Sequence, residues 1–128
     1  MRLLLDTHTL LWLAHEPAKL SDAVLEAVIS GDHEILVSAV SAMEIATKQR
    51  NGKLEYQSLL ATHFVREVTA QGFVPLSISC AHTGRAGNIV SPHKDPWDRI
   101  LAAQALTEDL TLATVDKFFA EVGVATYW

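Results

Sequence analysis

The chain has 128 residues, a length that fits one domain over residues 1–128. Its composition is 49% hydrophobic and 20% charged, which supplies one real core and excludes a disordered chain. The formal net charge of −5 counts against a nucleic-acid binder, whose surface is usually basic. A bound divalent cation would weaken that objection, because it cancels acidic charge locally and itself contacts phosphate.

The single cysteine, Cys80, excludes a disulfide within the chain and favours a reducing compartment. The leucines after Arg2 resemble the start of a signal peptide, but Asp6 interrupts them after three residues. No apolar run approaches the ~20 residues of a membrane span. We therefore expect a cytoplasmic chain that does not enter a membrane.

Short apolar strands alternate along the chain with longer helical patterns. In chain order the predicted elements are a strand over 2–6, a helix through 10–13 that Pro17 ends, a helix over 20–30, a strand over 34–37, helices over 41–50 and 57–71, a strand over 73–76, a short helix over 79–86, a helix over 98–108, a strand over 111–113, a short helix over 117–121 and a strand over 124–126. Ser21 is the expected N-cap of the second helix, and Gly31, Gly52 and Gly72 are expected to end helices.

This alternation predicts an α/β fold, with a parallel sheet covered by helices on both faces. In open sheets of this kind, ligands bind outside the carboxyl ends of the strands. That edge of the sheet is therefore where the functional residues are expected.

Four acidic residues fall at or just beyond the ends of strands, or at the start of the helix that follows: Asp6, Glu44, Asp98 and Asp116. In a parallel sheet these positions share one edge, so the four carboxylates would approach one another. Carboxylates within ~4–6 Å repel, and a divalent cation removes the conflict. Because no Cys or His cluster accompanies them, Mg²⁺ or Mn²⁺ fits better than Zn²⁺.

Three of these acids also have a purely structural interpretation. Glu44 would complete a capping box with Ser41. Asp98 follows Asp95 and Pro96, which have the pattern of a helix N-cap and first helical residue, and Asp116 would cap the next helix. Asp6 has no such duty, since Thr7 is available to cap the helix behind it.

Asp98 has a further argument, because the helix over 100–106 is apolar nearly all round and is expected to be buried. Its carboxylate would lie on the core-facing side of the helix start, where an uncompensated charge is costly.

Four segments carry a family resemblance, and they occur in order along essentially the whole chain. They are Leu-Leu-Leu-Asp6-Thr7-His8, Val37 to Lys48 around Glu44, His93-Lys94-Asp95-Pro96-Trp97-Asp98-Arg99 with the apolar run to Ala105, and Leu112-Ala113-Thr114-Val115-Asp116. Together they resemble the four signatures of the PIN-domain nucleases, most of all the VapC-type toxins of bacterial toxin–antitoxin modules.

The resemblance implies a three-layer α/β/α fold around a central, mainly parallel sheet of four to five strands. It also implies an Mg²⁺- or Mn²⁺-dependent endoribonuclease in which a metal-activated water hydrolyses an RNA phosphodiester bond. The expected partners are RNA, a cognate antitoxin and a second copy of the chain in a homodimer. Carried over residue by residue, the catalytic acids are Asp6, Glu44, Asp98 and Asp116, with Asp6, Asp98 and Asp116 as metal ligands.

Residues around the acids are candidates for supporting roles. Asp95 either supports the metal ligands without binding the metal or only caps a helix. Thr7 and Thr114 either hydrogen-bond the acids or cap helices. Lys48 forms a salt bridge with Glu44 one turn away or contacts a phosphate; Arg99 is in a similar position. We expect His8 and His93 to be structural or close to substrate, and Trp12 to belong to the core.

Rival functions fit the residues less well. A receiver-type phosphoacceptor domain would have adjacent acids after the first strand, where this chain has Asp6-Thr7. A phosphohydrolase with an Asp-x-Asp nucleophile pair is excluded at Asp6, because position 8 is histidine. The remaining alternative is a catalytically silent PIN-like module that binds RNA or protein, against which the complete set of acids argues.

Overall fold

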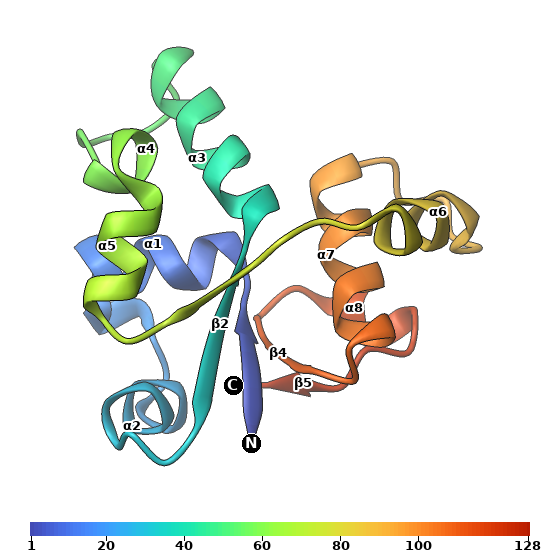
Figure 1. Cartoon of the computed structure of the whole chain (residues 1–128), viewed down its shortest axis with the longest axis horizontal. Helices are drawn as coiled ribbons and strands as arrows, with labels where there is room; N and C mark the ends of the chain where they lie inside the picture. Colours follow the sequence, from blue (N-terminus) through green and yellow to red (C-terminus); the bar gives the residue numbers. More distant parts are fainter.

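The computed structural model describes all 128 residues and places a five-stranded sheet between helices (Figure 1). The strands are β1 (Arg2–Leu5), β2 (Glu34–Ser38), β3 (Val74–Leu76), β4 (Thr111–Ala113) and β5 (Thr126–Tyr127). The helices are α1 (Thr7–His15), the 3₁₀ turn η1 (Pro17–Lys19), α2 (Asp22–Ile29), α3 (Ala39–Arg50), α4 (Leu59–Thr62), α5 (Phe64–Ala70), α6 (Cys80–Asn88), α7 (Pro96–Thr107) and α8 (Lys117–Glu121). None of these helices is both long and apolar enough to cross a bilayer.

All strand pairs are parallel, in the order β3-β2-β1-β4-β5, which confirms the expected α/β fold. The chain builds outward from β1 through β2 to β3, and then returns to the other side of β1 for β4 and β5. The direction of winding therefore changes between β1 and β4. In such sheets this switch point is where a crevice forms at the carboxyl ends of the strands.

Two apolar layers pack on the two faces of the sheet. Leu3 and Leu5 of β1 face a cluster with α1, α2, α4 and α5, whereas Leu4 between them faces α7 and α8. All three leucines are fully buried. Successive side chains of a strand point to opposite faces, so the burial of all three shows that helices cover both faces of the sheet here. Figure 1 shows these two groups of helices on opposite sides of the sheet, the three-layer α/β/α arrangement.

The predicted capping box at the start of the third helix is wrong. Helix α3 begins at Ala39, two residues earlier than expected, and its N-cap is Ser38, whose Oγ accepts a hydrogen bond from the N–H of Val40. Ser41 lies within the first turn, buried, and its hydroxyl bonds that of Thr7. Because the last residue of β2 supplies the cap itself, the helix starts directly at the strand end, and Glu44 has no capping role.

The predicted helix over 57–71 is interrupted. His63, with φ −134° and ψ 45°, is not helical and separates α4 from α5. Ser58 starts α4 as an N-cap to Leu60, so the helix begins later than expected.

Other boundaries move by a few residues. Helix α7 begins at Pro96 rather than at residue 98, since Asp95 is its N-cap and proline suits the first turn. Helix α6 runs from Cys80 to Asn88 rather than over 79–86, because Ser79 is its N-cap. The last strand is shifted to Thr126–Tyr127, because the N–H of Val124 bonds the carbonyl of Phe119 in α8 instead of a neighbouring strand.

Candidate catalytic site at the carboxyl end of the sheet

Asp6 occupies the N-cap position of α1 but does not cap it. Its side chain makes no capping hydrogen bond and instead accepts one from the Thr114 hydroxyl, with Oδ2 and Oγ1 2.7 Å apart. The pairing of β1 with β4 sets up this contact, because the Asp6 N–H also bonds the carbonyl of Ala113. The residue is only 6% exposed. A carboxylate is thus held below the surface with no structural task in its own helix.

The surroundings of Asp6 work against its charge. Burial raises the pKa of Asp6 above its ordinary value, and the nearby carboxylate of Glu44 raises it further. The hydroxyl of Thr114, the charge of His8 and the backbone of Thr7 oppose this rise without cancelling it. A nearby cation would therefore stabilise the ionised form of Asp6.

Glu44 lies on α3 and is 7% exposed. Its Oε2 is 2.8 Å from Nζ of Lys48, one helical turn further along. This salt bridge was expected from the i,i+4 spacing. It gives a nearly buried carboxylate a cationic partner on its own helix.

Asp98, in the first turn of α7, is bound by a histidine from the preceding loop. Nε2 of His93 is 2.8 Å from Oδ2 of Asp98, and the His93 ring stacks on Phe118 with centroids 3.9 Å apart. Burial raises the pKa of Asp98 to about 6; the His93 hydrogen bond opposes this shift, and Asp95, Asp6 and Asp116 add to it.

Asp116 is the N-cap of α8, with Oδ1 accepting the Phe118 N–H at 3.0 Å. This is the structural role considered for it from the sequence. Its own N–H donates to Oγ1 of Thr114, the same hydroxyl that donates to Asp6. One threonine therefore ties two of the acids together.

The acids gather at one end of the sheet, but more loosely than expected. Their charges act on one another in a chain, Glu44 on Asp6, and Asp6 and Asp116 on Asp98. No three His, Cys, Asp or Glu side chains lie close enough to hold a metal ion together. Like charges repel, and each carboxylate is turned toward its own hydrogen-bond donor instead of toward a common centre.

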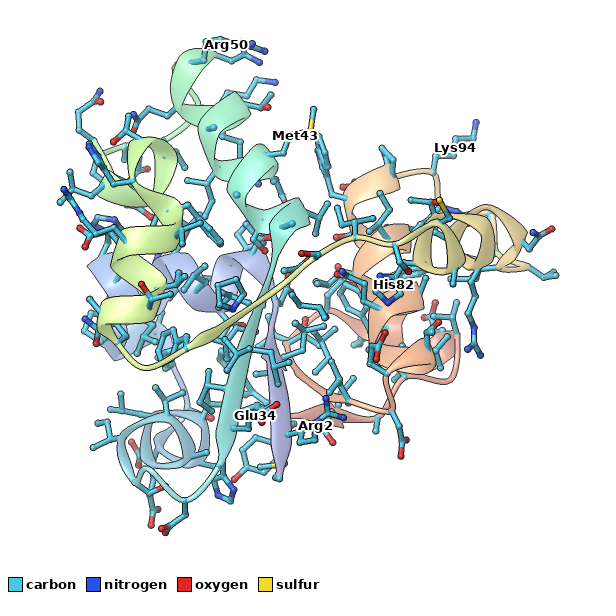
Figure 2. All side chains as sticks on the ribbon, viewed as in Figure 1. Arg2, Glu34, Met43, Arg50, His82 and Lys94 are labelled. Atoms are coloured by element: carbon cyan, nitrogen blue, oxygen red, sulfur yellow. The ribbon has the colours of Figure 1, made fainter.

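Figure 2 shows the whole molecule with its side chains, viewed as in Figure 1. Met43 of α3 and Lys94 of the loop before α7 project at one end of it, whereas Arg2 and Glu34, paired at the start of β1 and β2, lie at the opposite end. The neighbours of Glu44 and Asp98 thus mark the carboxyl edge of the sheet, where ligands of parallel sheets bind.

These residues suit Mg²⁺ or Mn²⁺. Every candidate ligand is a carboxylate oxygen, and such ions are commonly held by one or two carboxylates together with waters. Burial and neighbouring acids raise the pKa of both Asp6 and Asp98, and a bound cation would offset both effects by stabilising the ionised carboxylates. Zn²⁺ fits poorly, because Cys80 is on the exposed surface of α6 and Nε2 of His93 is already engaged with Asp98.

The supporting residues separate into two groups. Thr114 and Lys48 contact acids directly. The hydroxyl of Thr7 contacts Ser41 rather than an acid, and Asp95 caps α7 by accepting the N–H of Trp97.

Two contacts of the site were not found from the sequence. The His93–Asp98 bond joins residues five apart in the His93-to-Arg99 motif, so the motif held the signal, but the loop path decides whether the ring reaches the carboxylate. Arg99, expected to pair with an acid or a phosphate, binds backbone carbonyls instead. No pattern of residue types reveals carbonyl partners.

The chain belongs to the PIN domain family, whose model matches residues 3–125. No curated protein sequence matches it significantly. Among solved structures it is similar to a chain of VapBC2 from Rickettsia felis bound to a DNA fragment from their promoter, with 14% identity, a TM-score of 0.71, and coverage of 99% of this chain and 98% of that chain. It is also similar to a chain of DNA-bound VapBC from Salmonella typhimurium, with 16% identity, a TM-score of 0.70, and coverage of 99% and 97%. A chain of FitAcB from Neisseria gonorrhoeae has 20% identity, a TM-score of 0.60, and coverage of 98% and 96%. At these identities the similarity establishes a shared fold.

Proposed function

We propose that this chain is a Mg²⁺- or Mn²⁺-dependent endoribonuclease and the toxin of a toxin–antitoxin pair, acting on RNA in the cytoplasm. The observation that carries the proposal is Asp6. It is buried at the sheet's switch point, leaves its own helix uncapped, and lies beside Glu44 with a raised pKa. A stable fold has no need of that arrangement, and a cation site does.

Asp6, Asp98 and Asp116 are the residues that would hold the cation. When bound, it would neutralise charge on the scissile phosphate and lower the pKa of a water. The protein's own groups then orient the site. Thr114 holds Asp6 in place and opposes the rise in its pKa.

The fourth acid, Glu44, has a separate proposed role. Lys48 forms a salt bridge with Glu44, and that carboxylate, with Asp116, would orient the attacking water and accept its proton. In-line attack at phosphorus leaves a 5′-phosphate and a 3′-hydroxyl. Because the acids act on one another's charge, they titrate as a set.

A pocket beside the acids supports a nucleic-acid substrate despite the net charge of −5. Three of the chain's five lysines, Lys19, Lys48 and Lys53, line this cavity of about 240 Å³, together with Trp12 and Tyr56. Glu16 neutralises Lys19 in part, with 3.2 Å between Nζ and Oε2, whereas Lys53 has no carboxylate within salt-bridge distance. Lysines for phosphates beside aromatic rings for bases are the elements of a single-strand binding site.

A cognate antitoxin is the proposed protein partner, since the similar folds are chains of VapBC and FitAB complexes. A groove of about 730 Å³ between α1, α2, α4 and α5 is lined mainly by apolar side chains, and Ile29 and Leu59 on its wall are largely exposed. Exposed apolar surface of this kind is what a protein partner covers.

A homodimer is proposed as well, and light scattering on the purified chain tests it.

Cleavage of a single-stranded RNA by the purified chain, freed of any bound partner, tests the activity. We expect cleavage with Mg²⁺ or Mn²⁺, none with EDTA, and loss of cleavage in Asp6→Asn and Asp98→Asn. Asp22→Asn is the matched control, because Asp22 is an exposed acid on α2. Full activity in Asp6→Asn would refute the site. Binding of RNA without cleavage under any metal condition would favour the silent binding module.

A further inference from the structure

Arg99 follows Asp98 directly, yet it contacts no carboxylate. Its guanidinium donates to five backbone carbonyls of the segment that leads into α7. The donor–acceptor distances are 3.0 Å to Ala86, 3.5 Å to Gly87, 2.6 Å to Ile89, 3.4 Å to Ser91 and 2.9 Å to His93. All three guanidinium nitrogens take part, so the planar fork of donors that arginine provides is fully used.

The five carbonyls are of two kinds. Those of Ala86 and Gly87 belong to the last turn of α6, where carbonyls lack partners within the helix. Those of Ile89, Ser91 and His93 belong to the loop between α6 and α7. Hydrogen bonds from a charged donor are roughly twice as strong as neutral ones, so the loop is fixed to the start of α7.

Side chains hold the two ends of this loop, where Ile89 packs on the core and His93 stacks on Phe118, but not its middle. Val90, at its centre, is 99% exposed, and Lys94 and Asp95 are exposed as well. The helices on either side do not depend on the loop. Helix α6 has its own capping box between Ser79 and His82, and Leu101, Ala102 and Ala105 bury α7 in the core. Arg99 is thus the side chain that ties the backbone of this segment to α7, while the flanking helices are held independently.

The last of the five carbonyls connects Arg99 to the site. His93, held through its backbone, directs its ring to Oδ2 of Asp98 and stacks on Phe118. Phe118 in turn donates its N–H to Asp116. A displaced loop would therefore free Asp98 from His93. It would also remove the His93 ring from Phe118, whose N–H binds Asp116.

We propose that Arg99 is a positioning residue of the candidate site, which acts through the α6–α7 loop to hold His93 against Asp98. The inference rests on the proposed nuclease function for its effect on rate, but the loop restraint itself stands apart from that function. Arg99 therefore orients the carboxylate of its neighbour Asp98 indirectly, through the backbone and the ring of His93.

The first variant to test is Arg99→Gln, with Arg85→Gln as the matched control. Arg85 is an arginine on α6 whose one side-chain contact is a long 3.5 Å bond to Thr107. In Arg99→Gln we expect faster amide hydrogen exchange over residues 89–95, weaker Mn²⁺ binding, and kcat for RNA cleavage lower by about 10- to 100-fold, the usual loss when a ligand's supporting partner is removed. KM should change little, since Arg99 does not line the pocket of Lys19, Lys48 and Lys53, here called the lysine pocket.

A double-mutant cycle with His93→Ala separates positioning from a general loss of structure. If Arg99 acts through His93, the two substitutions together lower kcat no further than the larger single effect, whereas independent effects would multiply. Ethylguanidinium added to Arg99→Ala should restore part of kcat, and urea at the same concentration should not. Arg99→Lys, which retains a charge but cannot span five carbonyls, provides a milder variant if Gln prevents folding.

The outcomes distinguish the two proposals. Unchanged exchange over residues 89–95, or a multiplicative cycle, overturns the role of Arg99 while the nuclease stands. A wild-type chain that cleaves no RNA overturns the proposed function. Exchange rates and Mn²⁺ affinity then still decide whether Arg99 holds the loop and Asp98.

Discussion

Thr114 donates its hydroxyl hydrogen to Oδ2 of Asp6 across 2.7 Å, and Oγ1 of Thr114 itself accepts the backbone N–H of Asp116. The hydroxyl is buried, and both its donor and its acceptor capacities are used by acids of the candidate site. It thereby links the strand at the centre of the sheet to the N-cap of α8. The first prediction concerns this link.

Thr114→Val keeps the shape of the side chain and removes the hydroxyl. The carboxylate of Asp6 and the N–H of Asp116 then lose a partner, which should lower the free energy of unfolding by about 1–3 kcal/mol in urea denaturation. Because the Thr114 bond lowers the pKa of Asp6, its removal raises that pKa further, and the acidic limb of the RNA-cleavage profile should move to higher pH. Thr114→Ser should restore both properties. An unmoved acidic limb in Thr114→Val contradicts this role.

Asp98 should cost stability at neutral pH. Folding raises its pKa from 3.8 to about 6, so between these values the native state holds a proton that the unfolded chain has released. Its contribution is most favourable below pH 3.8, declines as the pH rises toward about 6, and stays low above it. Asp98→Asn removes the charge, and its Tm should exceed that of the wild type near neutral pH, with the difference vanishing in acid.

Divalent cations provide the complementary measurement. A ligand that binds only the folded state raises Tm, so Mn²⁺ should stabilise the wild type and leave Asp98→Asn nearly unchanged. The gain in stability and the loss of Mn²⁺ response should thus come from the same substitution, as expected for a functional residue. A variant less stable than the wild type at every pH would show that Asp98 is structural.

Lys48→Met should destabilise the fold through Glu44. The substitution leaves a carboxylate that is 7% exposed without its cationic partner, at a cost of about 1–3 kcal/mol or more. Adding Glu44→Gln should recover part of the loss, because the residual charge is then gone. Lys53→Met is the control for stability, since Lys53 forms no salt bridge. Equal losses for Lys48→Met and Lys53→Met in urea denaturation would argue against this explanation.

Lys53→Ala tests the lysine pocket. If Lys53 contacts a phosphate, RNA binding in EDTA weakens, and the slope of log affinity against log salt falls by about one. Arg66→Ala, a cation on α5 outside that pocket, should leave affinity and slope unchanged. The measurement is fluorescence anisotropy of a labelled single-stranded RNA at several salt concentrations. Identical slopes for Lys53→Ala and the wild type would exclude the contact.

The layout of the sheet could be predicted from sequence because it depends on local patterns. Leu3, Leu4 and Leu5 form an uninterrupted apolar strand, and such strands alternate with helical runs, so parallel pairing and the shared edge followed directly. The start of α3 could not be predicted in this way. Both Ser38 and Ser41 are good N-caps, and only the end of β2 decides between them.

The site was predictable to the level of which acids face one edge, and no further. Asp6, Glu44, Asp98 and Asp116 follow from strand order, but their individual partners depend on loop paths and on burial. The pairing of His93 with Asp98 and the carbonyls around Arg99 are fixed by how the α6–α7 loop folds back, which residue types do not encode.

The strand order has a consequence for synthesis of the chain on the ribosome. The central strand β1 is made first, and it pairs with β2 once residue 38 has emerged, but its other neighbour, β4, begins at Thr111. Asp6 therefore meets Thr114, which lies 108 residues further along the chain, only after α7 and β4 have been made. Until then a nascent chain carries the first two acids without the last two, so the candidate site is not assembled.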